Sequence, residues 1–350
     1  MIRNVTTKIA IYKNINLIFL KDIRHKRDEI CGFKKIADQY EYRKNAILNE
    51  LKENEIEIDF IEIVISRGGL LKPVKSGIYE VNEPMVEDLR KGIMGEHAIN
   101  LGGLLADGIA KSLPNAKAYI ADPVSVDEMN DLARIAGHPL FERKSIFHAL
   151  NQKYICRKYA RSANLKYDYM NCIVAHFGGG GVAVGAHLKG LVVDVNNAFD
   201  GDGPFALSRT GTLPVGDLVR MCFSGKYTKE KLLQMITHEG GLVGHLGTKN
   251  IEEIDRRISE GDEKAKFIMN ALGYQIAKEI GAMYTVLMGE VDAIILTGEI
   301  FNIRDFTKFI TERIEKFTKV VVYPLVDDMD SLANNAIMLL KGETEILEYK

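Results

Sequence analysis

The chain has 350 residues, of which 46% are hydrophobic and 27% are charged, and its formal net charge is -2. This composition is that of a globular protein, and the length favours two domains over one. A nearly neutral chain without a basic tract offers no electrostatic attraction to nucleic acid or to an anionic membrane, so we expect neither as a partner. No apolar run reaches transmembrane length, and the N-terminal residues lack a signal-peptide core, which predicts a cytoplasmic protein.

The four cysteines are scattered along the chain and form no C-x-x-C pair: Cys31, Cys156, Cys172 and Cys222. Each lies in an apolar or helical context. This pattern predicts reduced, buried thiols in a cytoplasmic protein rather than a metal site.

The first half of the chain alternates strand and helix patterns, as α/β domains do. It opens with two strands joined by a turn at Asn14, Ile15 and Asn16, and the helix that follows has its apolar residues on one face. In chain order, the predicted elements are strands at 7–12 and 17–20, a helix within 33–51, a buried strand at 58–65, two helices within 83–113 and a strand at 118–121.

The second half repeats this order. Its predicted elements are strands within 172–195, several helical stretches, a long helix at 262–288, a strand at 292–297, another helix, a strand at 320–323 and a last helix at 330–340. Residues 8–23 and 182–195 share one pattern, in which an alternating strand, a short turn and a second strand follow one another. We therefore expect a duplicated fold of two α/β domains, with a nucleotide in the cleft between them.

Four consecutive glycines between two apolar strands, Gly178 to Gly181, are the most informative motif. Glycine lets backbone N–H groups approach an oxyanion closely, so this turn is a candidate phosphate cradle. Gly178, Gly180 and Ala183 also satisfy the dinucleotide-binding spacing, but a helix would have to follow. The following residues instead alternate with a period of two and soon turn at Lys189, so a strand is predicted. A merely structural hairpin is the alternative.

Longer blocks of sequence resemble the butyrate kinases, a branch of the acetate kinase family, over nearly the whole chain. The matching blocks lie at 66–73, 79–85, 95–102, 122–129, 142–153, 193–219 and 241–248. The resemblance implies an α/β fold of two duplicated actin-like, sugar-kinase-like (ribonuclease H-like) domains with an interdomain cleft. The first domain would comprise residues 1–122 plus 328–350, and the second residues 123–327. It also implies phosphate transfer between ATP and a short-chain carboxylate, or between acyl phosphate and ADP, with Mg²⁺, in a homodimer or larger homo-oligomer.

This chemistry predicts positively charged catalytic side chains and no general base. A carboxylate is ionised at neutral pH and needs no general base, whereas two approaching anions require positive charge and N–H donors. Arg209 lies in a glycine-containing loop and matches the family's arginine at the transferring phosphoryl group. Arg67 precedes Gly68 and Gly69 at the end of a strand and is the second candidate. A surface arginine and an ion-pairing arginine are the respective alternatives.

The resemblance assigns further roles to individual residues. His176 would donate to a phosphoryl oxygen, and Asp122 would order the site or lie near Mg²⁺. The alternatives are a structural histidine and a turn residue before Pro123. Asp328 is a second candidate metal ligand. The candidate nucleotide-binding residues are Thr7, Lys8, Gly178, Gly179, Gly180, Gly181 and Gly298.

The chain also departs from the family pattern at its phosphate contacts. Residues 1–8 stand where the family has an asparagine-proline-glycine loop, and the strand that should precede this loop is absent. A central strand lost from a sheet leaves backbone groups on its neighbours without partners. Further departures are an extra Gly181, Ala183 in place of serine, Glu299 in place of glycine, Asp328 in place of glutamate, and Asn334 and Asn335 in the last helix.

These departures leave three hypotheses. The first is an active butyrate kinase-type enzyme. The second is a catalytically impaired family member that keeps the fold, the dimer and carboxylate binding. The third is an actin-like ATPase without an acyl acceptor.

Overall fold

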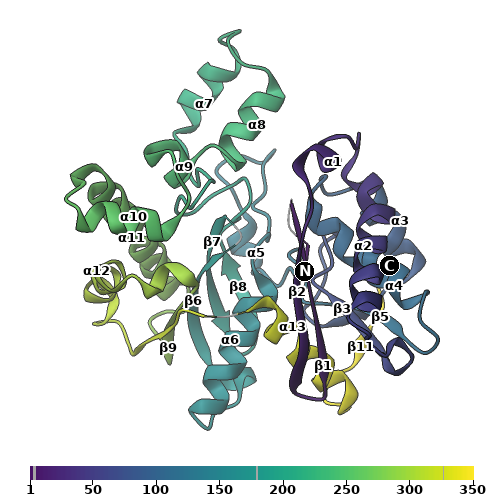
Figure 1. Cartoon of the computed structure of the whole chain (residues 1–350). Helices are drawn as coiled ribbons and strands as arrows, with labels where there is room; N and C mark the ends of the chain where they lie inside the picture. Colours follow the sequence, from purple (N-terminus) through teal and green to yellow (C-terminus); the bar gives the residue numbers. More distant parts are fainter. Residues whose placement is uncertain (3–4, 179, 326) are drawn as a thin grey trace. The chain divides into compact units, whose positions relative to one another are not determined.

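The computed structural model describes residues 1–2, 5–178, 180–325 and 327–350 (Figure 1). The chain divides into two compact units. Unit 1 comprises Met1–Asp127, Ala149–Asn151 and Asp327–Lys350, and unit 2 comprises Glu128–His148 and Gln152–Val326. The boundaries predicted from the sequence fall at 122/123 and 327/328. Both units contain sheets and helices, so the predicted α/β class is confirmed.

Unit 2 is built on a five-stranded sheet in the order β10-β9-β6-β7-β8. Its strands are β6 (Asn171–Gly178), β7 (Gly181–Leu188), β8 (Leu191–Val195), β9 (Ala293–Thr297) and β10 (Val320–Tyr323). β6, β7 and β8 are antiparallel neighbours, whereas β9 runs parallel to both β6 and β10. Lys189 and Gly190 both have positive φ, as the two-residue turn between β7 and β8 requires. A strand therefore follows the glycines, as predicted.

Alternate residues of β6 face different helices. Ile173, Ala175 and Phe177 belong to a core with α11 (Glu263–Val286), whereas Cys172 and Val174 belong to a core with α6 (Ala149–Ser162). The sheet is thus covered on both faces, which is why its strands are nearly continuous in apolar residues. The other helices of unit 2 are α5 (Asp131–Arg134), α7 (Val215–Cys222), α8 (Lys229–Thr237), α9 (Gly241–Leu246), α10 (Ile251–Ser259), α12 (Arg304–Ile314), and 3₁₀ turns η4 (Tyr167–Tyr169) and η5 (Glu299–Asn302).

Unit 1 has two separate sheets. β1 (Thr6–Lys13) and β2 (Asn16–Arg24) form an antiparallel hairpin, and β11 (Ile346–Leu347), β4 (Ile78–Glu80), β5 (Lys117–Ala121) and β3 (Ile63–Ser66) form a four-stranded sheet in that order. Its helices are α1 (Arg27–Cys31), α2 (Tyr40–Glu53), α3 (Glu83–Lys91), α4 (Leu101–Ala110) and α13 (Asp328–Leu340), with 3₁₀ turns at Ile36–Gln39, Ile58–Phe60 and Ala98–Asn100.

The split sheet of unit 1 is explained by comparison with unit 2. The hairpin β1–β2 corresponds to β7–β8, and the parallel pair β3–β5 corresponds to β9–β10. In unit 2, β6 pairs with both β7 and β9, but among the residues described in unit 1 no strand pairs with both β1 and β3. Helix α13 packs against β1 and β3 alike. The sheet of unit 1 is therefore broken between β1 and β3. Part of the β1 edge is nevertheless paired, because the Lys8 N–H donates to the Met1 carbonyl oxygen at 2.8 Å and the Met1 amino group donates to the Lys8 carbonyl oxygen at 2.6 Å.

Two predictions from the sequence are wrong. The buried strand at 58–65 is confined to β3, because its partner β5 begins at Lys117, opposite Ile63. Residues Ile58–Phe60 form a 3₁₀ turn, and Phe60 is 77% exposed. Of the four cysteines predicted to be buried, Cys31 and Cys222 are exposed.

Over the ranges described above, the helices are all too short or too polar to span a bilayer.

Candidate active site

The glycine turn of unit 2 closes the β6–β7 hairpin. Gly178 pairs with Gly181, and Gly180 has a φ of 93°, which favours glycine. Gly179 lies outside the described residues. A Cβ atom on Gly181 would overlap Nη1 of Arg209 and the carbonyl oxygen of Ala198. Gly181 is therefore the surface against which the Arg209 guanidinium lies.

Arg209 is held at this turn by two contacts. Its Nη1 donates a hydrogen bond to the carbonyl oxygen of Ala198 at 2.5 Å, and its guanidinium lies over the Phe199 ring, 5.2 Å from the centroid. The side chain is only partly buried. These contacts fix the guanidinium beside the glycine turn, where its positive charge would attract an anion.

A small pocket adjoins Arg209. Its apolar wall includes Val182, Phe199, Pro204 and Ile236. The lining also includes Asp200 and Asp202, so the pocket combines one cation and two carboxylates with apolar side chains.

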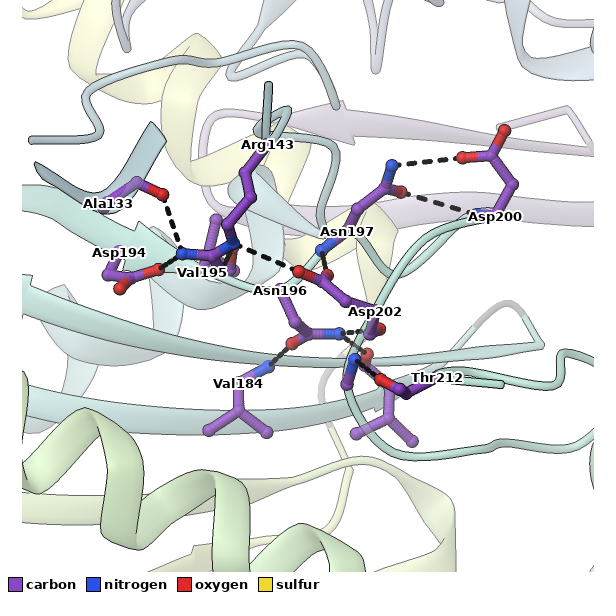
Figure 2. Close-up of polar contacts among 12 residues, drawn as sticks. Ala133, Arg143, Val184, Asp194, Val195, Asn196, Asn197, Asp200, Asp202 and Thr212 are labelled. Carbon is purple, nitrogen blue, oxygen red and sulfur yellow. Dashed lines mark hydrogen bonds and ion pairs between the residues drawn. The ribbon is translucent and has the colours of Figure 1, made fainter. Parts of the chain in front are cut away.

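The loop that carries these groups is braced by Arg143 (Figure 2). The Arg143 guanidinium donates to Asp194 at 2.9 Å, to Asp202 at 3.2 Å and to the carbonyl oxygens of Ala133 and Val195 at 2.8 and 3.2 Å. These four hydrogen bonds from the Arg143 side chain connect β8 to the loop that follows it.

Asn196 and Asp202 extend this network. The Asn196 side chain accepts a hydrogen bond from the Val184 N–H at 2.7 Å and donates to the Val182 carbonyl oxygen at 2.9 Å, and the Asp202 carboxylate accepts one from the Asn197 N–H. The sequence analysis assigned no role to Arg143, Asn196 or Asp202. The signal was available, because all three lie within blocks that carry the family resemblance.

His176 and Gly298 lie beside the same turn. His176 is buried in β6, its Nε2 lies close to Gly178, and its ring centroid is 4.7 Å from that of His148. Gly298 follows β9 with a φ of 120°, and a Cβ there would overlap the carbonyl oxygen of Phe177. Unit 2 therefore brings His176, Arg209, Gly298 and the described glycines of the turn together, while the side chain of Glu299 is exposed.

Unit 1 gathers a second group of predicted residues at the N-terminus of α13. Lys8 forms an ion pair with Asp327 at 2.6 Å, and Arg67 forms one with Asp328 at 3.4 Å. The other oxygen of Asp328 accepts a hydrogen bond from Asn151 at 2.7 Å. Two cations and two carboxylates thus meet at one helix end.

The other two predicted residues of unit 1 have different surroundings. Thr7 is fully buried, and its hydroxyl contacts His25 Nε2 at 2.8 Å and Arg43 Nη1 at 3.1 Å, so it faces the interior rather than the group around Lys8. Asp122 is buried and accepts hydrogen bonds from the Ser76 hydroxyl at 2.6 Å and the Gly77 N–H at 2.9 Å. Through these contacts, the carboxylate after β5 fixes the turn that precedes β4.

Two solved structures, an acetate kinase and a propionate kinase, share this fold. The acetate kinase of Entamoeba histolytica matches with a TM-score of 0.70 at 14% identity, over 97% of this chain and 97% of that one. The propionate kinase of Francisella tularensis matches with a TM-score of 0.68 at 17% identity, over 95% of this chain and 91% of that one. The fold class is therefore the actin-like one that the resemblance predicts.

The sequence comparison defines the family. The acetokinase family model matches residues 137–324. Butyrate kinase 2 of Clostridium acetobutylicum is 48% identical over 347 residues, which covers 99% of this chain and 97% of that protein. The chain belongs to the acetokinase family, and the resemblance to butyrate kinases is confirmed.

Proposed function

We propose that this protein is a carboxylate kinase that catalyses the reversible reaction of butyrate with ATP to give butyryl phosphate and ADP. The observation that carries the proposal is the position of Arg209, which lies against the glycine turn and lines a pocket with apolar walls. A carboxylate could place its charge near the guanidinium and its alkyl chain on Val182 and Phe199.

In the proposed reaction, the carboxylate attacks the γ-phosphorus of ATP in line with the leaving ADP. The new bond joins a carboxylate oxygen to phosphorus, the bond from phosphorus to the β–γ bridging oxygen breaks, and no proton is transferred. The main barrier is charge repulsion, so the Arg209 guanidinium, the His176 imidazole and the backbone at the glycine turn would stabilise the transferring group. Arg143 acts through the loop and positions Arg209.

Unit 1 holds its own candidate group of cations and carboxylates, at the N-terminus of α13. Carboxylate oxygens are the ligands that Mg²⁺ prefers, so Asp327 and Asp328 fit a magnesium–nucleotide complex. When bound, Mg²⁺ would neutralise phosphate charge. Lys8 and Arg67, which pair with these carboxylates in the structure, would then be available to the phosphates or the acid.

The remaining parts of the proposal rest on the family resemblance. They are a homodimeric assembly and a cytoplasmic location, where ATP and short acids are available.

Acyl hydroxamate formation with ATP, Mg²⁺ and butyrate tests the proposal. We expect wild-type turnover, and a loss of about 10²–10³-fold in kcat for Arg209→Ala, as is typical when one charge-stabilising donor is removed. The matched control is Arg256→Ala, because Arg256 is an exposed arginine on α10 that pairs with Glu260, one turn along the same helix. This control should retain activity within about twofold.

The same assay separates the alternatives. Hydroxamate formation by the wild type no greater than by Arg209→Ala would support a catalytically impaired family member. ATP hydrolysis that does not change with added carboxylate would support an ATPase without an acyl acceptor.

A further inference from the structure

Two of the cysteines meet a histidine inside unit 2. Cys156 on α6, Cys172 on β6 and His187 on β7 are fully buried, and their potential ligand atoms all lie within 4.8 Å of one another. The Cys156 and Cys172 sulfurs are 2.8 Å apart, and Cys156 Sγ is 3.6 Å from His187 Nδ1. Because Cys172 and His187 are direct cross-strand partners, the hairpin itself holds two of the three groups together.

The hydrogen bonds around His187 decide which ring nitrogen is free to bind an ion. The side-chain amide of Gln152 donates to the Ala183 carbonyl oxygen at 2.9 Å, so its oxygen is the atom that faces His187 Nε2 at 3.0 Å. Nε2 therefore carries the proton and donates it. The lone pair is on Nδ1, which faces Cys156 Sγ and the Tyr167 hydroxyl. A histidine whose outer N–H is held by an oxygen acceptor is the usual arrangement of a metal ligand.

The chemistry of this donor set selects the ion. Two thiolates and a neutral imidazole favour Zn²⁺ over Mg²⁺ or Ca²⁺, which prefer oxygen ligands. Two thiolates and Zn²⁺ together carry no net charge, so the bound ion would not leave an uncompensated charge in the interior. The Tyr167 hydroxyl oxygen lies 2.8 Å from Nδ1, beside the three potential ligands.

We propose that Cys156, Cys172 and His187 form a structural zinc site that ties α6 to the β6–β7 hairpin. Binding replaces the two thiol protons by two Zn–S bonds and releases both protons, with no change of oxidation state. The two sulfurs separate by about 1 Å, because Zn–S bonds of about 2.3 Å in a tetrahedron place sulfurs about 3.8 Å apart. The site lies six residues along β6 from Gly178, about 20 Å away, and is independent of the proposed phosphate transfer.

The test is zinc retention by the full chain, reduced under anaerobic conditions, incubated with Zn²⁺ and passed through a desalting column. We expect one zinc per chain, measured by mass spectrometry of the metal, in the wild type and in the variant Cys31→Ser/Cys222→Ser, which lacks the two exposed cysteines. Cys172→Ser should retain less than a tenth of this amount. Co²⁺ in place of Zn²⁺ should give the thiolate charge-transfer band of tetrahedral cobalt in the same two proteins only.

Thermal unfolding of the wild type is a second measurement of zinc binding. It uses no variant, so it does not depend on whether Cys172→Ser folds. Zinc should raise Tm by about 5 °C or more, and a chelator should reverse this rise. The proposal is overturned if the wild type retains no stoichiometric zinc, or if retention depends on Cys31 and Cys222. The proposal is also overturned if the isolated protein contains a Cys156–Cys172 disulfide and still binds no zinc after that disulfide is reduced. In that case the two cysteines form a redox pair rather than a metal site.

Discussion

At the scale of single residues, Glu279 on α11 should make the stability of the protein depend on pH near neutrality. Burial, and after it the charge of Asp202, raises the pKa of Glu279 from 4.5 to about 7. Because the pKa is higher in the folded than in the unfolded protein, folding favours the protonated side chain. Its stabilising contribution is complete below about pH 4.5 and is lost as the pH rises through about 7.

Glu279→Gln removes the ionisation while keeping a side chain of similar shape. At about pH 8.5 the variant should therefore be more stable than the wild type by roughly 1–3 kcal/mol, and near pH 5 the two should differ little. Urea unfolding at the two pH values measures this difference. Glu345→Gln, which alters an exposed glutamate, is the control. A gain of the same size at both pH values would contradict the assigned cause.

The arginine of the site could be predicted from the sequence, but its packing could not. Arg209 stands in a long block with a family-like sequence, and the chemistry of two approaching anions requires a cation. Gly181, by contrast, was interpreted as an extra glycine in the phosphate turn and as a candidate nucleotide-binding residue. The structure shows that this glycine leaves room for the Arg209 guanidinium beside the strand. Gly181 and Arg209 are 28 positions apart, and neither the sequence around Gly181 nor the sequence around Arg209 indicates this contact.

At the scale of elements, the weakest part of unit 1 should be the pair of strands that flank its missing central strand. Most residues of β1 and β3 are only partly buried, whereas those of β7 and β9 in unit 2 are buried almost throughout. Strand edges without a partner expose their amides to water and open at low cost.

Hydrogen exchange tests this difference directly. Amides on the open edges of β1 and β3, such as those of Ala10 and Ile65, should exchange at least about 10²-fold faster than those of Val184 and Ile295 in β7 and β9. Peptide-level exchange read by mass spectrometry resolves the four strands, and the β7–β8 turn at Lys189 serves as the rapidly exchanging reference. Equal protection in the two units would show that the edges of β1 and β3 are covered in solution.

Element boundaries were less predictable than element types. The strand at 63–66 was expected to start five residues earlier, because Ile56, Ile58 and Phe60 continue the apolar alternation. Alternation alone cannot show where a partner strand starts, and β5 is too short to pair with those residues. Thr7 was likewise assigned to phosphate binding from its place in the motif. Its side chain contacts His25, which follows β2, and Arg43, which lies on α2. Both residues are far from Thr7 in the sequence.

At the scale of the whole molecule, the duplication was visible in the sequence because both halves open on a strand, a turn and a strand. The order of strands in unit 2 then follows from the short connections and from the crossovers between parallel strands. The meeting of Cys156, Cys172 and His187 was not visible, because α6 brings one thiol to a hairpin that carries the other two groups. Scattered cysteines were therefore interpreted as inert, although two of them face one histidine.

The exposed apolar face of α7 leads to a prediction about assembly. Helix α7 buries none of its residues within its own chain, and Figure 1 shows α7 and α8 projecting from the rest of unit 2. Val215, Val219 and Phe223 follow one another at four-residue intervals and are 73%, 50% and 87% exposed. Residues at this spacing share one face of a helix, and a continuous apolar face of this kind marks an interface.

We therefore expect α7 to contact a second copy of the chain in the proposed homodimer. Sedimentation equilibrium should give twice the chain mass of 39.2 kDa for the wild type and the single-chain mass for Val219→Asp/Phe223→Asp, because two buried charges would face each other across the interface. Leu132→Asp is the matched control, since Leu132 is a 90% exposed leucine on α5 of the same unit. A dimer that survives the double substitution would place the contact on another face of unit 2, and a monomeric wild type would remove the dimer from the proposed function.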